Sequence, residues 1–168
     1  QGNIIENNTL TNFKGNAIVN QFGATSTKNV YRNNTITGGG SMAVGTYSLV
    51  EANTLESTLT VTEGCTAVEN NLYGLTISGK NVVARDNTVA GAVTINSAAT
   101  NTTFTGNNVT GTVTVNSNDN NIEGNWINTT GDYAVDLKTT SNNNVTNNYL
   151  VSAKIYGDKA VNYKEENR

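Results

Sequence analysis

The segment Tyr31-Arg32-Asn33-Asn34-Thr35-Ile36 decides the fold of this 168-residue chain, because related copies of it recur along the whole sequence. Each copy holds an asparagine with an apolar residue three positions before it and another two positions after it. The aligned asparagines are Asn8, Asn34, Asn53, Asn71, Asn87, Asn107, Asn125 and Asn148. Their period of about 20 residues is typical of repeat architectures, so the sequence predicts a solenoid.

The asparagine of each copy is predicted to lie at a sharp bend. The two apolar residues around it are too far apart for one strand face and too close for two separate elements. Asparagine tolerates the left-handed backbone conformation, and its side-chain amide can bond the asparagine one turn away. We therefore expect the eight asparagines to form an internal ladder, with successive turns separated by the strand spacing of about 4.8 Å.

A second strand is predicted after each bend. Segments such as Leu59-Thr60-Val61-Thr62 and Val93-Thr94-Ile95-Asn96 alternate strictly between apolar and polar residues, which indicates one buried face. The chain has 31 Asn and 27 Thr but no Pro, a bias that favours short strands linked by bends. The predicted fold is an all-β, single-stranded, right-handed parallel β-helix of about eight rungs without helices. We expect residues 1–168 to be one segment of a longer repeat protein.

The composition argues against several classes of partner. The formal net charge is -3 and no basic stripe is present, which disfavours nucleic acid and anionic membranes. No apolar run is long enough to cross a bilayer, so no membrane segment is expected. Cys65 is the only cysteine and histidine is absent, so we interpret Cys65 as a structural thiol and predict neither a metal site nor a cofactor.

These repeats resemble the right-handed parallel β-helix repeats of adhesin-like surface proteins of methanogenic archaea. The resemblance is clearest from Asn125 through Asn148 to Gly157-Asp158-Lys159-Ala160-Val161. Similar asparagine-rich rungs occur in the pectate-lyase-like β-helix superfamily and in viral tailspikes. The resemblance implies an extracellular or cell-surface module, non-catalytic, that projects from the cell or contributes a face binding glycans or neighbouring cells. Two alternatives remain: a carbohydrate-active enzyme of the polysaccharide lyase or epimerase kind, and a viral receptor-binding β-helix.

Acidic residues are the candidates for an enzyme site. The position two before the asparagine reads Glu6, Arg32, Glu51, Glu69, Arg85, Thr105, Glu123 and Thr146. Stacked turns would place Glu51 beside Glu69, a pair that could bind calcium or act as acid and base. An exposed ladder of alternating charges explains the same residues, and we favour it. Asp132, Asp136 and Asp158 could form a second acidic set, although turn formation accounts for them more simply.

Aromatic residues are the candidates for a binding site. The position after the asparagine is expected to point outward, and it reads Thr9, Thr35, Thr54, Leu72, Thr88, Asn108, Trp126 and Tyr149. On adjacent rungs Trp126 and Tyr149 would lie about 5 Å apart, an aromatic step suited to stacking on sugar rings. The alternative is that a loop, at 128–132 or 138–144, folds over the two rings and buries them.

Overall fold

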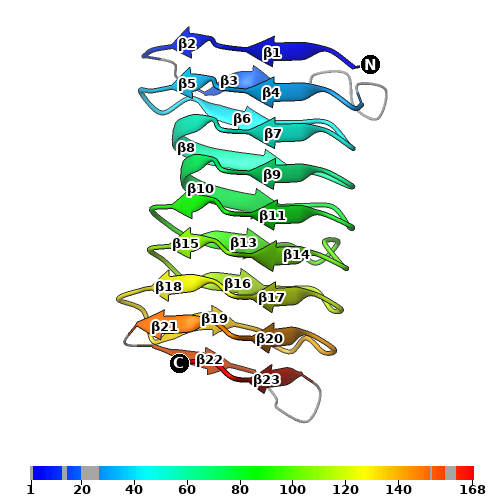
Figure 1. Ribbon diagram of the computed structural model, residues 1–168, viewed down its shortest axis with the longest axis vertical. Coiled ribbons are helices and arrows are strands. Elements are labelled where there is room, and N and C mark those ends of the chain that lie inside the picture. The colour runs from blue at the N-terminus through cyan, green and yellow to red at the C-terminus, as the bar shows by residue number, and fades with distance from the viewer. Residues whose placement is uncertain (1, 13–14, 20–26, 152, 158–161) are drawn as a thin grey trace.

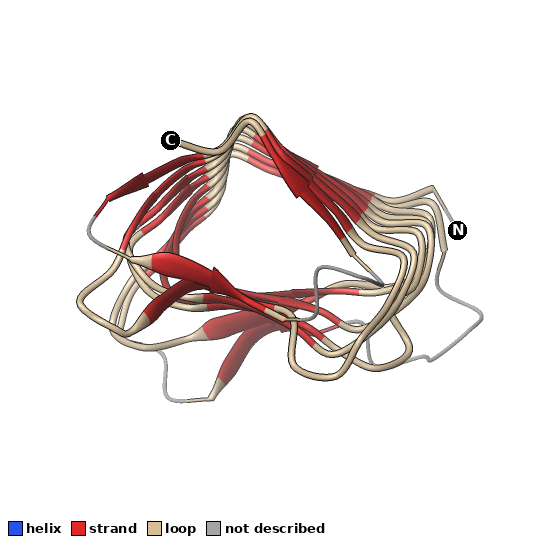
Figure 2. Cartoon of the chain, turned by 90° about the horizontal axis from the view of Figure 1, so that it is seen from below, coloured by secondary structure: helices blue, strands red, loops and turns tan. Residues whose placement is uncertain are grey.

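The computed structural model describes residues 2–12, 15–19, 27–151, 153–157 and 162–168, and within them it contains strands and no helix. The strands stack into a parallel coil with its two ends at opposite ends of the long axis (Figure 1). Seen from the amino-terminal end, the chain turns clockwise while it moves away from the viewer, so the coil is right-handed (Figures 1 and 2). The predicted all-β parallel β-helix is therefore confirmed.

Face 1 of the coil is a nine-stranded parallel sheet with one strand from each turn. Its strands pair in order along the axis and each is three residues long. They are β1 (Ile4–Glu6), β4 (Val30–Arg32), β7 (Leu49–Glu51), β9 (Thr66–Val68), β11 (Val83–Arg85), β14 (Thr103–Thr105), β17 (Asn121–Glu123), β20 (Asn144–Thr146) and β23 (Tyr163–Glu165).

Faces 2 and 3 together form a 14-stranded sheet. Face 2 holds β2 (Thr9–Leu10), β5 (Thr35–Ile36), β12 (Thr88–Val89), β15 (Asn108–Val109), β18 (Trp126–Asn128) and β21 (Tyr149–Val151). Face 3 holds β3 (Asn16–Val19), β6 (Ser41–Ala43), β13 (Val93–Ile95), β16 (Val113–Val115), β19 (Tyr133–Asp136) and β22 (Lys154–Tyr156). The longer strands β8 (Thr54–Val61) and β10 (Asn71–Ile77) run through both faces.

The three faces surround a common axis (Figure 2), and the buried apolar side chains of the core point towards it. Alternation along each short strand sends its middle or flanking apolar residue inward, and parallel stacking aligns these residues into columns. One such column of face 1 contains Tyr31, Val50, Ala67, Ala84, Phe104, Ile122 and Val145, all buried. Towards the two ends Ile5, Leu10, Leu150 and Ile155 are only partly buried, so the core is best enclosed in the central turns.

A ladder of asparagines lines the first corner, the bend between faces 1 and 2. Within the described residues it consists of Asn8, Asn34, Asn53, Asn70, Asn87, Asn107, Asn125, Asn148 and Asn167. At each step the backbone N–H and the side-chain amide of one asparagine both donate to Oδ1 of the next. The amide also donates to a backbone carbonyl, as from Asn87 Nδ2 to the oxygen of Ala67 at 3.0 Å.

The ladder corrects one predicted residue and adds another. Asn70, buried, occupies the rung that the sequence assigned to Asn71, whereas Asn71 is exposed and pairs in register with Thr54 and Thr88. The hydrophobic frame at this turn is therefore shifted by one residue. Asn167 continues the ladder beyond the eight predicted positions, because it accepts from both donors of Asn148.

The left-handed conformation belongs to the residue before each ladder asparagine, not to the asparagine itself. These nine residues have φ between 52° and 63°: Asn7, Asn33, Ala52, Glu69, Asp86, Gly106, Gly124, Asn147 and Glu166. This residue turns the chain, and the asparagine that follows points its side chain into the coil. Ala52, Glu69 and Glu166 bear the steric cost that Gly and Asn largely avoid.

A second, interrupted ladder lines the second corner, between faces 3 and 1, five residues before the first one. Asn3 bonds Asn29, and the backbone of Asn29 donates to Oγ of Ser48. After a gap the series resumes as Thr102, Asn120, Asn143 and Asn162. In the gap lie Val82 and Cys65, both fully buried, and Cys65 Sγ contacts the carbonyl oxygen of Gly45 at 3.1 Å. Cys65 is thus a structural thiol, as predicted.

Replacing Asn70 by Ala should lower the free energy of unfolding by about 3 kcal/mol. The substitution removes Oδ1 of Asn70, which accepts from the backbone N–H and the side-chain amide of Asn53. It also removes Nδ2 of Asn70, which donates to the carbonyl oxygen of Val50, and all these groups are buried. The adjacent, exposed Asn71 provides the control, since Asn71→Ala should change stability by less than about 0.5 kcal/mol. Urea unfolding followed by circular dichroism measures both variants. Equal losses of stability in the two variants would contradict the place of Asn70, and not Asn71, in the ladder.

Ala52→Gly should raise the free energy of unfolding by about 1 kcal/mol, because φ at this position is 52° and glycine adopts it without a Cβ clash. The reciprocal change is Gly124→Ala at the equivalent position, where φ is +63° and an added Cβ meets no atom within 4 Å. Thermal unfolding of the two variants should shift in opposite directions. A shift of the same sign in both would rule out backbone strain at this corner.

Candidate functional site

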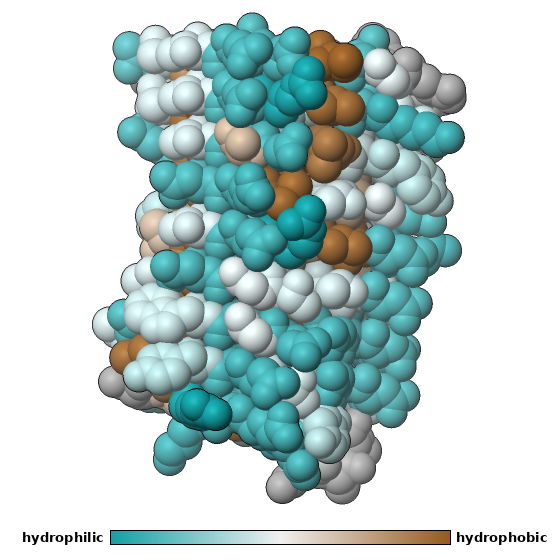
Figure 3. Space-filling model, in the orientation of Figure 1, coloured by the Kyte–Doolittle hydropathy of each residue, from teal (hydrophilic) through white to brown (hydrophobic). Residues whose placement is uncertain are grey.

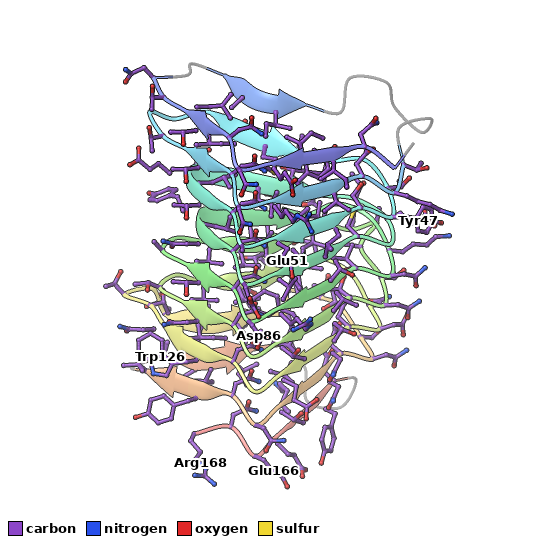
Figure 4. All side chains as sticks on the ribbon, turned by 45° about the horizontal axis from the view of Figure 1, so that its top comes forward. Tyr47, Glu51, Asp86, Trp126, Glu166 and Arg168 are labelled. Carbon is purple, nitrogen blue, oxygen red and sulfur yellow. The ribbon has the colours of Figure 1, made fainter. Side chains whose placement is uncertain are left out.

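Trp126 and Tyr149 point outward from face 2, each directly after a ladder asparagine. Because Asn125 and Asn148 turn their side chains inward, alternation places the next side chain on the surface. The two aromatic residues are Cα partners in the pairing of β18 with β21. Trp126 is 39% exposed and Tyr149 is 55% exposed, and Figure 4 shows Trp126 at the outer edge of the coil. The alternative in which a loop buries the pair is therefore wrong.

The same outward column continues on both sides of the aromatic pair. Towards the amino terminus its members are the polar residues Asn108 and Thr88. Towards the carboxyl terminus the next member is Arg168, whose N–H donates to the oxygen of Asn148 while Leu150 donates to the oxygen of Arg168. Arg168 thus follows Asn167 as Tyr149 follows Asn148. Leu72, predicted to belong to this outward column, is buried. Its place in the column is taken by Asn71, which pairs with Thr54.

A hollow of about 220 Å³ lies beside Tyr149 at the first corner. It is lined by Asn147, Asn148, Tyr149, Glu166 and Arg168. Asn147 and Glu166 are the left-handed corner residues of two successive turns, so both side chains project from the bend. Sequence reasoning did not find Glu166 and Arg168. The signal was Asn167, because placing it in the ladder would have put Arg168 in the outward column.

The predicted stacking of Glu51 beside Glu69 is wrong. Glu51 in β7 has Arg32 and Val68 as its Cα partners on the two sides. Glu69 lies one residue further on, at the bend, with φ of 55°. The column predicted to alternate in charge therefore contains Val68 in place of Glu69. Its Arg32 does form an ion pair with Glu6, at 2.5 Å.

The second acidic set of Asp132, Asp136 and Asp158 is described only in part. Asp158 lies outside the described residues. Asp136 pairs with Lys138, and the hydrogen bond and charge of this carboxylate raise the pKa of Lys138. Among the residues that the structure describes, no three Cys, Asp or Glu side chains gather as a metal site would require, and no helix is long and apolar enough to span a membrane.

Two other surface features compete as binding candidates. Tyr133 and Tyr156 on face 3 have ring centroids 4.9 Å apart, so each ring covers part of the other. Figure 3 shows a hydrophobic column on the upper part of the front face. In face 1, Ile4, Val30, Leu49, Thr66 and Val83 pair in register and form one column. Ile4 is 58% exposed but the other apolar members are half-buried, so this column offers little open apolar area.

Comparison with known proteins adds no further assignment: no protein-family model, no curated protein and no solved structure matches this chain. The parallel β-helix is supported by its own geometry. Trp126, Tyr149 and the adjacent hollow are the strongest candidate site within the described residues.

Exposure of the indole can be measured directly, since Trp126 is the only tryptophan. We expect acrylamide to quench the native fluorescence substantially, because the side chain is 39% exposed. Blue-shifted emission that resists the quencher would mean that Trp126 is covered in solution.

Proposed function

We propose that this coil is a non-catalytic module of an adhesin-like, extracellular or cell-surface protein, and that it binds glycans on face 2. The observation that supports the proposal is the open pair of Trp126 and Tyr149 on paired strands. Each ring offers an apolar face with a polar edge, which matches a sugar ring with its C–H groups on one face and hydroxyls around it.

The ladder beneath the pair makes it a rigid platform. Asn125, directly before Trp126, donates to Oδ1 of Asn148, directly before Tyr149, from both its backbone and its amide at 2.9 Å. These bonds fix the separation of the two turns and hence of the backbone positions that carry Trp126 and Tyr149. A platform ordered before binding loses little conformational entropy when a ligand arrives.

A stacked coil of this kind can serve as a stalk as well as a binding face. Each turn contacts its neighbours, so the coil extends along one axis and presents its outward columns in a line. The resemblance to adhesin-like repeats supports glycans or the surface of a neighbouring cell as partner. Glu51, which the enzyme alternative could use together with Glu69, lies between Arg32 and Val68 in the sheet and not beside Glu69.

Immobilised polysaccharides and cell-wall fragments test the proposal. An open site of two aromatic residues should bind with a dissociation constant on the order of 1 mM, so polymeric ligands that engage many molecules at once are needed for retention. We expect wild type to be retained by at least one glycan class, and both Trp126→Ala and Tyr149→Ala to lose that retention.

The matched control is Tyr73→Ala, since Tyr73 is also an outward tyrosine of this sheet, 62% exposed, but lies on a distant turn. It should bind as wild type does. All variants should keep the wild-type melting temperature, because none of the three side chains is buried. Retention that survives both aromatic substitutions, or no retention by any glycan, would refute the proposal.

A further inference from the structure

We infer that the hollow beside Tyr149 selects a neutral sugar, with Glu166 and Arg168 holding adjacent hydroxyl groups of a ring stacked on Tyr149. This inference rests on the proposed function and assigns a ligand class to the same site. In the outward column, Trp126, Tyr149 and Arg168 lie on three successive turns. They span two strand spacings, roughly 10 Å.

The size of the hollow limits what it can hold. At about 220 Å³ it is smaller than the range of roughly 300–1,000 Å³ typical of sites for drug-sized ligands. It therefore suits a single ring rather than a longer segment. The remainder of a glycan chain would continue along the column towards Trp126, on the open surface of face 2.

The polar groups around the hollow include both hydrogen-bond acceptors and hydrogen-bond donors, and a sugar hydroxyl can pair with either kind. Carboxylate oxygens of Glu166 accept, the guanidinium of Arg168 donates, and the amide of Asn147 does both. A pair of neighbouring hydroxyls can donate to the first group and accept from the second. Figure 4 shows Glu166 and Arg168 both extending from the last turn, away from the coil.

These two charged side chains are not committed to other contacts. Ion pairs in the described part of the chain join Glu6 to Arg32, Glu63 to Lys80, Asp86 to Arg85 and Asp136 to Lys138. Glu166 and Arg168 belong to none of these pairs, and no side-chain hydrogen bond from either is present among the described residues. Within the described residues, neither side chain has to give up such a contact to receive a ligand.

The charges decide between a neutral and an acidic sugar. Glu166 lines the hollow together with Arg168, so the carboxylate of a uronic acid would meet repulsion as well as attraction. The whole chain carries a formal net charge of -3, which also disfavours the approach of a polyanion. Neutral hydroxyls use both charged groups without such repulsion.

Binding to mannan, to a neutral β-glucan and to polygalacturonate, with wild type beside Glu166→Gln and Arg168→Gln, tests the inference. We expect retention by a neutral polymer and not by polygalacturonate, and about tenfold weaker binding in each variant. Glu69→Gln is the matched control, because Glu69 occupies the same corner position with φ of 55° on a distant turn. It should bind as wild type does.

The outcomes separate this inference from the proposed function. Retention that Trp126→Ala abolishes but that neither Glu166→Gln nor Arg168→Gln weakens would overturn the role of the hollow and leave the aromatic platform standing. Preference for polygalacturonate would overturn the neutral class. Failure of wild type to bind any glycan would refute the proposed function and this inference with it.

Discussion

The stacked amides of the first corner are the interaction on which the rest of the coil depends. A parallel coil must turn sharply between its faces, and at the turn the regular pairing of backbone groups is interrupted. The ladder asparagine restores it, because its Oδ1 accepts the backbone N–H and the amide of the preceding turn. Among the described residues, no buried side-chain nitrogen or oxygen atom lacks a hydrogen-bond partner. Buried polar groups therefore add to stability here instead of subtracting from it.

This ladder also determines where the candidate site lies. An inward asparagine forces the next residue outward, so Trp126, Tyr149 and Arg168 share a column on consecutive turns. The residue before each ladder asparagine has a left-handed backbone and lies at the edge of the same surface. Asn147 and Glu166 occupy this position on two successive turns. The spacing between the outward residues of such a site is set by the pairing of the backbone strands, and loops contribute little to it.

Adjacent asparagines explain why the sequence misplaced one rung. In Asn7-Asn8 the second asparagine enters the ladder, whereas in Asn70-Asn71 the first one does. The apolar frame does not separate the two choices at this turn, because Val68 with Tyr73 satisfies it for Asn71 and Ala67 with Leu72 satisfies it for Asn70. Only pairing with the neighbouring turns decides, through the partnership of Asn71 with Thr54 and Thr88.

The sequence by itself determined the fold class, the inward asparagines at seven of the eight predicted positions, the buried strand faces and the outward direction of Trp126 and Tyr149. These follow from local periodicity, because alternation and bend residues act within a few positions of each other. The tertiary structure alone decided the register of the fourth rung, the separation of Glu51 from Glu69, the exposure of the aromatic pair and the hollow with Glu166 and Arg168. Each of these depends on which residues of different turns stand side by side, and turns of unequal length leave that open until the backbone hydrogen bonds between them are formed.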